Sequence, residues 1–192
     1  MPCPEEEKES RVPESMAARL MKSRTILLSG AVDEELATSV IAQTLVLDAE
    51  NHDPIKCIVT TPGGIVDIGF AIHDVLQFVE SKIICIAAGF VASMGVPIML
   101  SAKKEDRFTL PNTRFMMHQP STGAAGQAAD IRITAQEILK TRERLNKLIA
   151  EESGQPLERV TADNDRDFWM SADEAVEYGL VSKIIRTAKD LG

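Results

Sequence analysis

The sequence predicts an α/β fold with a mostly parallel sheet. Short apolar runs alternate along the chain with longer stretches in which apolar residues recur at helical spacing, as in βαβ units. The chain has 192 residues, 44% of them hydrophobic and 26% charged, which is typical of one domain with a single core. We expect a mobile acidic tail at residues 1–16, which are rich in glutamate and proline, and one folded domain at residues 17–192.

The amino-terminal half is predicted to contain three strands and two helices. The strands are residues 25–30, 55–61 and 83–89, and the helices are residues 34–50 and 65–81. Asp33 is a typical N-cap residue for the first helix. Residues 62–64, Pro-Gly-Gly, form a turn with free backbone amides between the second strand and the second helix. The third strand is continuously apolar, as expected for a strand that is covered on both faces.

The carboxyl-terminal half begins with a sharp turn around Ser93. The elements predicted after it are a short helix, strands over residues 106–110 and 114–118, a long amphipathic helix over 130–152, a helix over 171–179 and a last strand over 180–186. Ser171 and Glu174 are spaced as a capping box, and Gly154 and Gly179 are expected to stop the two helices.

Charge and cysteine content exclude several functions. Lys plus Arg number 21 and Asp plus Glu 29, so a chain of formal net charge -8 should not bind nucleic acid or an anionic membrane. Residues 83–100 carry no charge and are long enough to span a bilayer, but Gly89, Gly95 and Pro97 favour a strand, a turn and a buried helix. The three cysteines form no metal or disulfide pattern, and the amino terminus lacks the apolar region of a secretory signal, which favours the cytoplasm.

Two side chains are candidates for nucleophilic chemistry. Ser93 lies where an apolar strand turns into a helix, and the amides of a helix amino terminus favour developing negative charge. A serine at this position is also an ordinary helix cap. His118 ends a strand and enters a loop, where catalytic groups are often held over a rigid scaffold, although a lone histidine there is often structural. His52, in a polar turn, and His73, within a helix, are weaker candidates for a base.

A base histidine needs a carboxylate that holds its tautomer. Asp163, Asp165 and Asp167 all precede an apolar pair; Asp167 is nearest to it, but the spacing does not choose among the three. Acyl transfer also needs amide donors for the oxyanion, and the amides of Gly64, in the turn, and Met94, just after the serine, are our candidates.

Taken together, residues 16–185 resemble the proteolytic subunit of the ATP-dependent Clp protease. The motifs that carry the resemblance are TPGG (61–64), VASMG (91–95), PNTRFMMHQP (111–120), GQAADI (126–131), DRD (165–167) and SADEAVEYGLV (171–181). The resemblance implies a crotonase-like β-α superhelix with a protruding strand-helix handle, and residues 17–192 would form a single peptidase domain of this type.

The resemblance also implies a site and an assembly. A Ser-His-Asp triad falls on Ser93, His118 and Asp167, with the oxyanion hole on the amides of Gly64 and Met94, and no metal or organic cofactor is implied. The family stacks two seven-membered rings into a barrel with the sites inside, fed with unfolded polypeptide by a separate AAA+ ATPase.

Two further segments of the family's assembly have counterparts in this chain. The segment 119–152 resembles the handle that interlocks the rings, and its small residues at 123–129 would let a substrate lie alongside as an added strand. Asp165 and Arg166 resemble the family's ring-to-ring ion pair.

Some features depart from the family pattern. The acidic segment 1–15 replaces an apolar segment that gates the pore in the family. Lys56 and Ile58 occupy positions at which aromatic residues often line the ATPase docking pocket. Before the Pro-Gly-Gly turn, Thr60–Thr61 replaces the usual Asn-Ser. Partnership with the usual unfoldase is therefore less strongly predicted than peptidase chemistry. Two alternatives stay open: a noncatalytic structural subunit of a mixed barrel, and an acyl-CoA enzyme of the crotonase type, in which a Ser-His pair would be superfluous.

Overall fold

The computed structural model describes residues 15–121 and 125–191. Of the predicted tail, residues 1–14 lie outside the described part of the chain, Ser15 precedes a helix and Met16 is the first residue of that helix. The Ser15 hydroxyl accepts a hydrogen bond from the Ala18 N–H and caps α1 (Met16–Lys22). This helix is not among the predicted elements: it is only seven residues long, and none of them is buried, although Met21 packs against the core.

The described residues form one sheet of seven strands, which confirms the predicted α/β class. The strands are β1 (Thr25–Ser29), β2 (Ile55–Thr61), β3 (Ile83–Ala92), β4 (Arg107–Thr109), β5 (Arg114–Met117), β6 (Phe168–Met170) and β7 (Lys183–Ile184). Their order is β1-β2-β3-β4-β7, and β5 joins β3 to β6. Among these strands only the β5–β6 pair is antiparallel.

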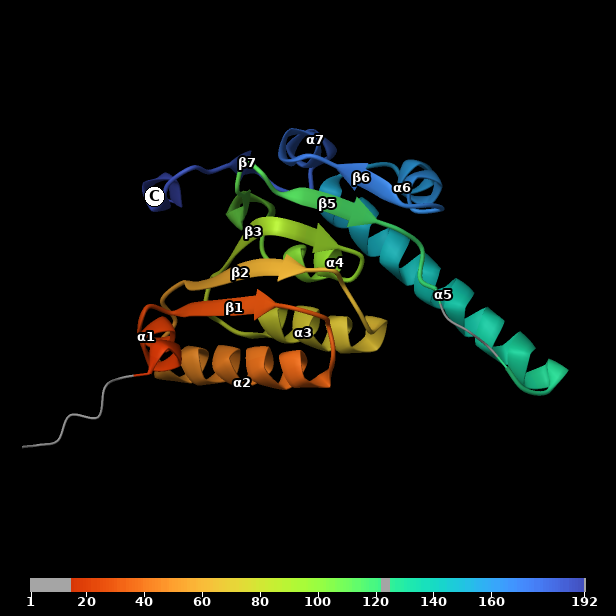
Figure 1. Ribbon diagram of the computed structural model, residues 1–192, viewed down its shortest axis with the longest axis horizontal. Helices are drawn as coiled ribbons and strands as arrows, with labels where there is room; N and C mark the ends of the chain where they lie inside the picture. The colour runs from red at the N-terminus through yellow and green to blue at the C-terminus, as the bar shows by residue number, and fades with distance from the viewer. Residues whose placement is uncertain (1–14, 122–124, 192) are drawn as a thin grey trace, which may run out of the picture.

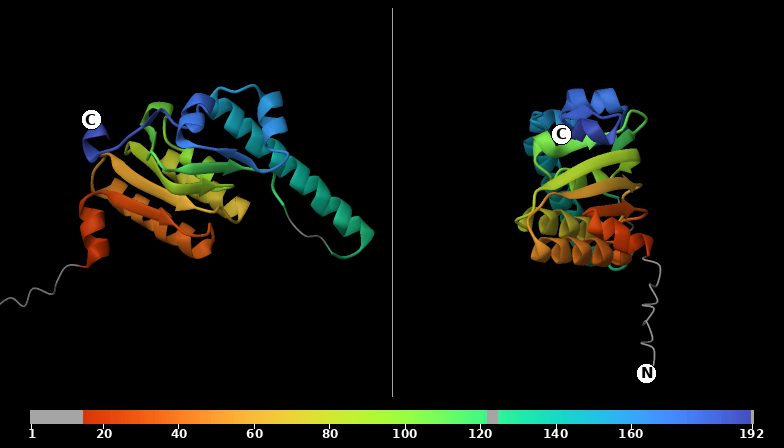
Figure 2. Two further views of the ribbon diagram at one scale, coloured as in Figure 1. Left: turned by 45° about the horizontal axis from the view of Figure 1, so that its top comes forward. Right: turned by 90° about the vertical axis from the view of Figure 1, so that its left-hand side faces the viewer.

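Helices pack beside the sheet and extend from it. They are α2 (Glu34–Glu50), α3 (Val66–Phe78), α4 (Gly95–Met99), α5 (Ala128–Ser153), α6 (Leu157–Asp163) and α7 (Ala172–Tyr178), with short 3-10 turns at Lys104–Asp106 and Ala188–Leu191. α2 and α3 lie side by side along one face of β1 and β2 (Figure 1). The amino-terminal part of α5 projects away from the body of the molecule (Figure 2).

β3 divides the sheet into two parts. Its first half pairs with β4 and its second half with β5, and the strand changes partner around Gly89, whose φ angle of 66° lies in the left-handed region. The register with β2 also shifts between Val59 and Thr61, which marks a bulge. This bend carries the end of β3, and with it Ser93, toward β5.

The helix caps predicted from the sequence are present in the structure. Asp33 accepts a hydrogen bond from the Leu36 N–H at the start of α2, and Ser171 forms the predicted capping box with Glu174. Gly154 and Gly179 end α5 and α7 in left-handed conformation.

Three predictions need correction. The last strand is limited to Lys183–Ile184 instead of residues 180–186, and residues 157–170, for which no helix or strand is predicted, contain α6 and β6. Of the predicted handle strand, residues 122–124 lie outside the described part, and the described residues on either side, 119–121 and 125–127, form no strand. In the part of the chain that the structure describes, no helix combines the length and apolarity needed to cross a membrane.

Candidate active site

Ser93 lies directly after the carboxyl end of β3, in the turn that leads into α4. Its φ angle is 52°, a left-handed conformation that non-glycine residues rarely adopt. Two backbone hydrogen bonds hold it: the Ser93 N–H donates to Met116 O (2.8 Å), and the Val96 N–H donates to Ser93 O (3.1 Å). A strained strand-to-helix turn of this kind presents the serine hydroxyl at the edge of the sheet, as a nucleophile requires.

The register between β3 and β5 brings His118 to this hydroxyl. Ala92 pairs with Met116 in a parallel ladder, so the residues that follow the two strands emerge at the same edge of the sheet. The His118 Nε2 and Ser93 Oγ atoms lie 2.8 Å apart, which is hydrogen-bond length. The structure therefore brings together the two residues that the sequence analysis singled out, although they are 25 positions apart.

The other two histidines have structural partners. His73 is buried, and its Nδ1 atom lies 2.8 Å from Pro97 O, which ties α3 to α4. His52 is exposed and lies near the carboxylates of Asp48 and Glu80. Neither of them contacts a hydroxyl in the described part of the chain.

The antiparallel register of β5 and β6 selects Asp167 from the three aspartates. Met117 pairs with Phe168, so the next residue of one strand, His118, faces the preceding residue of the other, Asp167. The Asp167 Oδ1 and His118 Nδ1 atoms lie 3.7 Å apart, within ion-pair distance but longer than a hydrogen bond. The side chain of Asp167 is 63% exposed, against 28% for His118.

The remaining aspartates are placed elsewhere. Asp163 accepts a hydrogen bond from the Tyr178 hydroxyl (3.0 Å). Burial raises the pKa of Tyr178 well above its ordinary value, and this hydrogen bond raises it further. The backbone carbonyl of Asp165 accepts a hydrogen bond from Gln119 Nε2 (2.9 Å). The side chains of Asp165 and Arg166 are exposed and form no ion pair within the described residues, so the structure of one chain leaves both available to a partner.

The Pro-Gly-Gly turn packs against the serine. Gly63 has a φ angle of 89°, and a Cβ atom at this position would meet Ser93 Cβ at 2.6 Å and the Met94 amide nitrogen at 2.9 Å. Only glycine fits there, because the conformation is left-handed and the space is filled. The sequence analysis gives no role to Gly63; the doubled glycine is the signal that could have indicated a close approach.

The two amides expected to bind an oxyanion lie beside this contact. The Val32 N–H donates to Gly63 O, and the Ile65 N–H donates to Val32 O. Because successive amides of an extended backbone point to opposite sides, the Gly64 N–H points away from Val32, to the side on which β3 and Ser93 lie. In the described turns, loops and helix caps, no backbone carbonyl accepts a hydrogen bond from the Gly64 N–H or the Met94 N–H. Met94 is held by its side chain, which packs against Gly69 of α3.

A narrow cavity of about 20 Å³ opens beside Ser93 and His118. Its walls are apolar, and two buried asparagines from α5 and the end of α6 form its polar part; the lining comprises Val66, Met94, Pro97, Met117, Pro120, Leu145, Ile149, Asn146 and Asn164. The sequence analysis misses both asparagines, since nothing in their spacing distinguishes them from surface residues.

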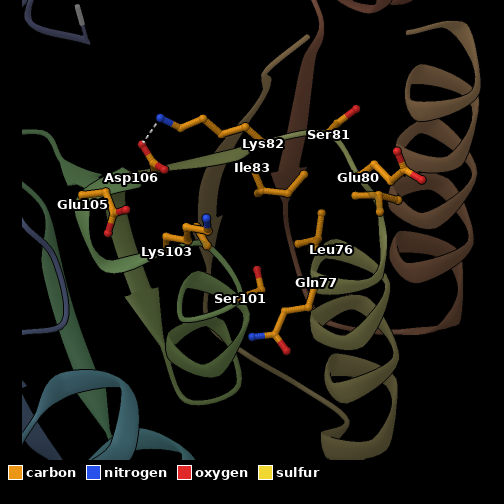
Figure 3. A pocket seen from close by; sticks show the side chains of 12 residues that line it. Leu76, Gln77, Glu80, Ser81, Lys82, Ile83, Ser101, Lys103, Glu105 and Asp106 are labelled. Atoms are coloured by element: carbon orange, nitrogen blue, oxygen red, sulfur yellow. Dashed lines mark ion pairs between the residues drawn. The ribbon is translucent and has the colours of Figure 1, made fainter. Parts of the chain in front are cut away.

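A larger hollow of about 530 Å³ lies at the opposite edge of the sheet, before the amino ends of β3 and β4 (Figure 3). Lys82 and Asp106 form a 2.7 Å ion pair there. Active sites of parallel sheets lie at the carboxyl ends of the strands, and this hollow has no histidine among its described lining residues. It is therefore not the candidate site.

Within the described ranges, neither a metal-binding cluster nor a reactive thiol competes with Ser93 as the candidate site. The described residues contain no cluster of three or more histidines, cysteines or acidic residues that could hold a metal ion. Cys57 and Cys85 are buried on adjacent strands, and the hydrogen bond from Cys85 together with burial raises the pKa of the Cys57 thiol well above its ordinary value. A thiol in this state is a poor nucleophile. Cys3 lies outside the described residues.

The site has the arrangement of a serine hydrolase. A serine lies on a strained turn, a histidine is within hydrogen-bond distance of it, a carboxylate lies on the far side of the histidine, and two unpaired amides lie beside the serine. The chain belongs to the Clp protease family: the family model matches residues 7–188.

Individual relatives agree with this assignment. The chain is 48% identical over 174 residues to the ATP-dependent Clp protease proteolytic subunit 3 of Rhizobium etli, covering 91% of this chain and 90% of that protein. It is 44% identical over 181 residues to subunit 2 of Pseudomonas aeruginosa, covering 92% and 90% of the two chains. A solved structure of a point mutant of ClpP1 from Listeria monocytogenes superimposes with a TM-score of 0.87 at 42% identity, covering 93% of this chain and 100% of that one. Likeness of this extent confirms the crotonase-like fold.

Proposed function

We propose that this chain is a serine endopeptidase subunit of a self-compartmentalising barrel that degrades unfolded polypeptides. The observation that carries the proposal is the 2.8 Å contact between Ser93 Oγ and His118 Nε2 on a strained turn. A serine hydroxyl is a weak nucleophile unless a base lies within hydrogen-bond reach, and here the base is in place.

The proposed reaction uses only side chains and amides of this chain. His118 takes the Ser93 proton as Ser93 attacks the peptide carbonyl, and the Gly64 and Met94 amides hold the oxyanion. Asp167 keeps the His118 tautomer and stabilises the imidazolium. His118 then gives the proton to the leaving amine, and water, activated by the same histidine, releases the acyl group from Ser93. The reaction as proposed needs no metal or organic cofactor.

Exposed apolar side chains support assembly into a barrel of two stacked seven-membered rings. The projecting helix α5 exposes Ile131, Ile133 and Leu139, and α2 exposes Leu45 and Val46, which would be an unfavourable surface for an isolated chain. Asp165 and Arg166, exposed beside Asp167, are the proposed contact between rings. Of the segment 123–129, expected to let an unfolded substrate lie alongside as an added strand, Ala128 and Ala129 belong to α5, so residues 125–127 are the described part of the proposed edge.

A separate ATP-dependent unfoldase is the proposed source of substrate, because the Rhizobium etli and Pseudomonas aeruginosa relatives are named subunits of ATP-dependent proteases. The proposed docking surface is the half-buried apolar set of Ile58, Ile84 and Leu191, which packs over a small buried cluster of Ile86, Phe108 and Ile185. The nearby Lys56 is charged where the family often has an aromatic residue, so the partner's docking segment is expected to differ from the usual one.

A noncatalytic subunit of a mixed barrel is the second candidate, and the 3.7 Å gap between His118 and Asp167 favours it. Replacing Ser93 with Ala separates the two. An active subunit loses all hydrolysis of a fluorogenic peptide in this variant, while native mass spectrometry still shows a particle of fourteen subunits. A scaffold subunit shows the same particle, but the wild-type protein neither hydrolyses the peptide nor reacts with a serine-directed phosphonate. A monomeric wild-type protein would contradict the barrel itself.

A further inference from the structure

Two cysteines lie side by side in the sheet, away from the candidate active site. Cys57 of β2 and Cys85 of β3 are directly paired in the parallel register. They are 1% and 0% exposed, and both belong to the main hydrophobic core, so their side chains project from the same face of the sheet. The proposed peptidase reaction uses neither of them.

The spacing of neighbouring strands suits a disulfide between these two residues. Adjacent strands lie about 4.8 Å apart, and a disulfide joins residues whose Cα atoms are about 4.4–6.8 Å apart. The thiols of Cys57 and Cys85 are also hydrogen-bonded to each other. A covalent bond between the two sulfur atoms therefore needs no change in the strand register.

The two thiols do not behave alike. The hydrogen bond to Cys85, burial, and the repulsion from a charge on Cys85 raise the pKa of the Cys57 thiol well above its ordinary value. Cys57 therefore keeps its proton, and Cys85 is the sulfur left to attack an oxidant. An attacking sulfur with a second cysteine in contact is the arrangement of redox-sensitive pairs, in which the second cysteine resolves the first product.

The hollow at the amino ends of β3 and β4 gives a short path for a small oxidant (Figure 3). Its volume is about 530 Å³, and Leu76 and Ile83 line it. Both residues belong to the core that contains the two cysteines, and Ile83 precedes Cys85 by two positions on the same face of β3. Buried thiols cannot reach a peptide, but hydrogen peroxide is neutral and little larger than water, and has only these side chains to pass.

We infer that Cys57 and Cys85 are a site of reversible oxidation, at which a hydroperoxide converts the two thiols into a disulfide that ties β2 to β3. The Cys85 sulfur attacks one peroxide oxygen, the O–O bond breaks, and a sulfenic acid and water form. The Cys57 sulfur then attacks the Cys85 sulfur, the S–O bond breaks, and hydroxide leaves as water with the Cys57 proton.

The overall reaction is balanced, and it does not depend on the proposed peptidase function. Two thiols and one hydrogen peroxide give one disulfide and two waters, so the thiols are oxidised and the peroxide is reduced. A thiol reductant reverses the reaction by exchange. In a reducing compartment the bond would therefore be transient and would report exposure to peroxide.

The disulfide should stabilise the fold. It closes a loop over residues 57–85, which contains the Pro-Gly-Gly turn and α3. Because a cross-link removes conformational freedom from the unfolded chain, the oxidised protein should unfold about 10 °C above the reduced protein.

Peptide mapping after peroxide treatment tests the inference. The assembled protein carries Cys3→Ser, so that Cys57 and Cys85 are its only thiols, and after exposure to hydrogen peroxide it is unfolded in N-ethylmaleimide. The expected product is a peptide pair linked through Cys57 and Cys85, which dithiothreitol separates. Calorimetry of the same samples should show the rise in unfolding temperature. Cys57→Ser and Cys85→Ser are the matched controls and should show neither the link nor the rise.

Other products would overturn the inference. Maleimide on both cysteines after peroxide treatment, at room temperature and again just below the unfolding temperature, would show that the pair is not oxidised. Sulfinic acid on Cys85 without a link would show that Cys57 does not resolve the first product. A disulfide between two chains would show that the pair does not close within the sheet. An equal rise in unfolding temperature in Cys57→Ser would show that the cross-link is not its cause.

Discussion

His118 Nδ1 and Asp167 Oδ1 lie 3.7 Å apart, whereas His118 Nε2 and Ser93 Oγ lie 2.8 Å apart. The histidine is thus hydrogen-bonded toward the nucleophile and only loosely paired toward the carboxylate. Asp167 is 63% exposed, and an exposed pair at this distance contributes little in water. Orienting carboxylates in Ser-His-Asp sites are buried and hydrogen-bonded, so the account requires that assembly covers Asp167 and shortens this contact.

Replacing Asp167 with Asn tests its orienting role. Because the amide cannot stabilise the imidazolium and favours the wrong tautomer, kcat of the assembled protein should fall by about 10⁴-fold, with little change in KM. The measurement is steady-state hydrolysis of a fluorogenic peptide. Asp173→Asn removes an exposed carboxylate from the first turn of α7 and should leave kcat unchanged. Equal activity of the two variants would show that Asp167 has no part in catalysis.

Replacing Arg166 with Ala tests the contact between rings. If Arg166 pairs with an acidic group of the opposite ring, the variant should release single rings of seven subunits in native mass spectrometry and lose peptide hydrolysis with them. The matched control is Arg186→Ala, which removes an exposed arginine near the carboxyl terminus. Persistence of the wild-type particle in Arg166→Ala at low protein concentration would refute the contact.

Gly63→Ala tests the close packing of the turn against the nucleophile. Its Cβ would meet Ser93 Cβ at 2.6 Å, so the variant should displace Ser93 and lower kcat/KM by about 100-fold, the loss typical of a 1 Å misplacement. Gly30→Ala is a matched control, because Gly30 also has a left-handed φ angle, of 104°, but its Cβ would meet nothing within 4 Å. Both variants should lose about 1–2 kcal/mol of stability from the strained backbone. Only Gly63→Ala should lose activity, and similar activities would count against the packing argument.

The sequence analysis predicts regular elements well where local chemistry decides them. α2 begins and ends at the residues predicted, because Asp33 caps it and an apolar face, including Val40 and Leu47, packs against the sheet. α1 escapes prediction because it has no buried face, and β6, only three residues long, is too short to show a period.

The site is only partly predictable, because some of its residues are brought together by contacts between distant segments. Ser93 and His118 can be singled out from local position, at the ends of apolar strands. The choice of Asp167 over Asp163 and Asp165 depends on the β5–β6 register, which local sequence does not determine. The close packing of Gly63 against Ser93 likewise arises from a contact between segments distant in the chain.

Asp48 makes stability depend on pH in the acid range. The hydroxyl and N–H of Ser81 donate to its carboxylate at 2.7 and 2.8 Å, and chiefly the hydroxyl bond lowers the pKa of Asp48 from 3.8 to about 2. A lowered pKa in the folded state means that the contribution is complete above about pH 4 and disappears as the pH falls toward 2.

Asp48→Asn should therefore lower the free energy of unfolding at pH 7 by about 2 kcal/mol, measured by urea titration at fixed protein concentration. The difference from wild type should shrink between pH 4 and pH 2. Asp53→Asn, which changes an exposed carboxylate nearby, should show neither effect. A difference that stays constant with pH would show that Asp48 acts through packing and not through its charge.

The central claim is that the Ser93 hydroxyl is the nucleophile activated by His118. The most direct measurement is mass-spectrometric mapping of the adduct formed by a serine-directed phosphonate, with residual peptide hydrolysis followed in the same samples. The account predicts a single modified residue, Ser93, hydrolysis lost in proportion to labelling, and no labelling in His118→Ala. An adduct on another serine, or undiminished hydrolysis by fully labelled protein, would contradict it.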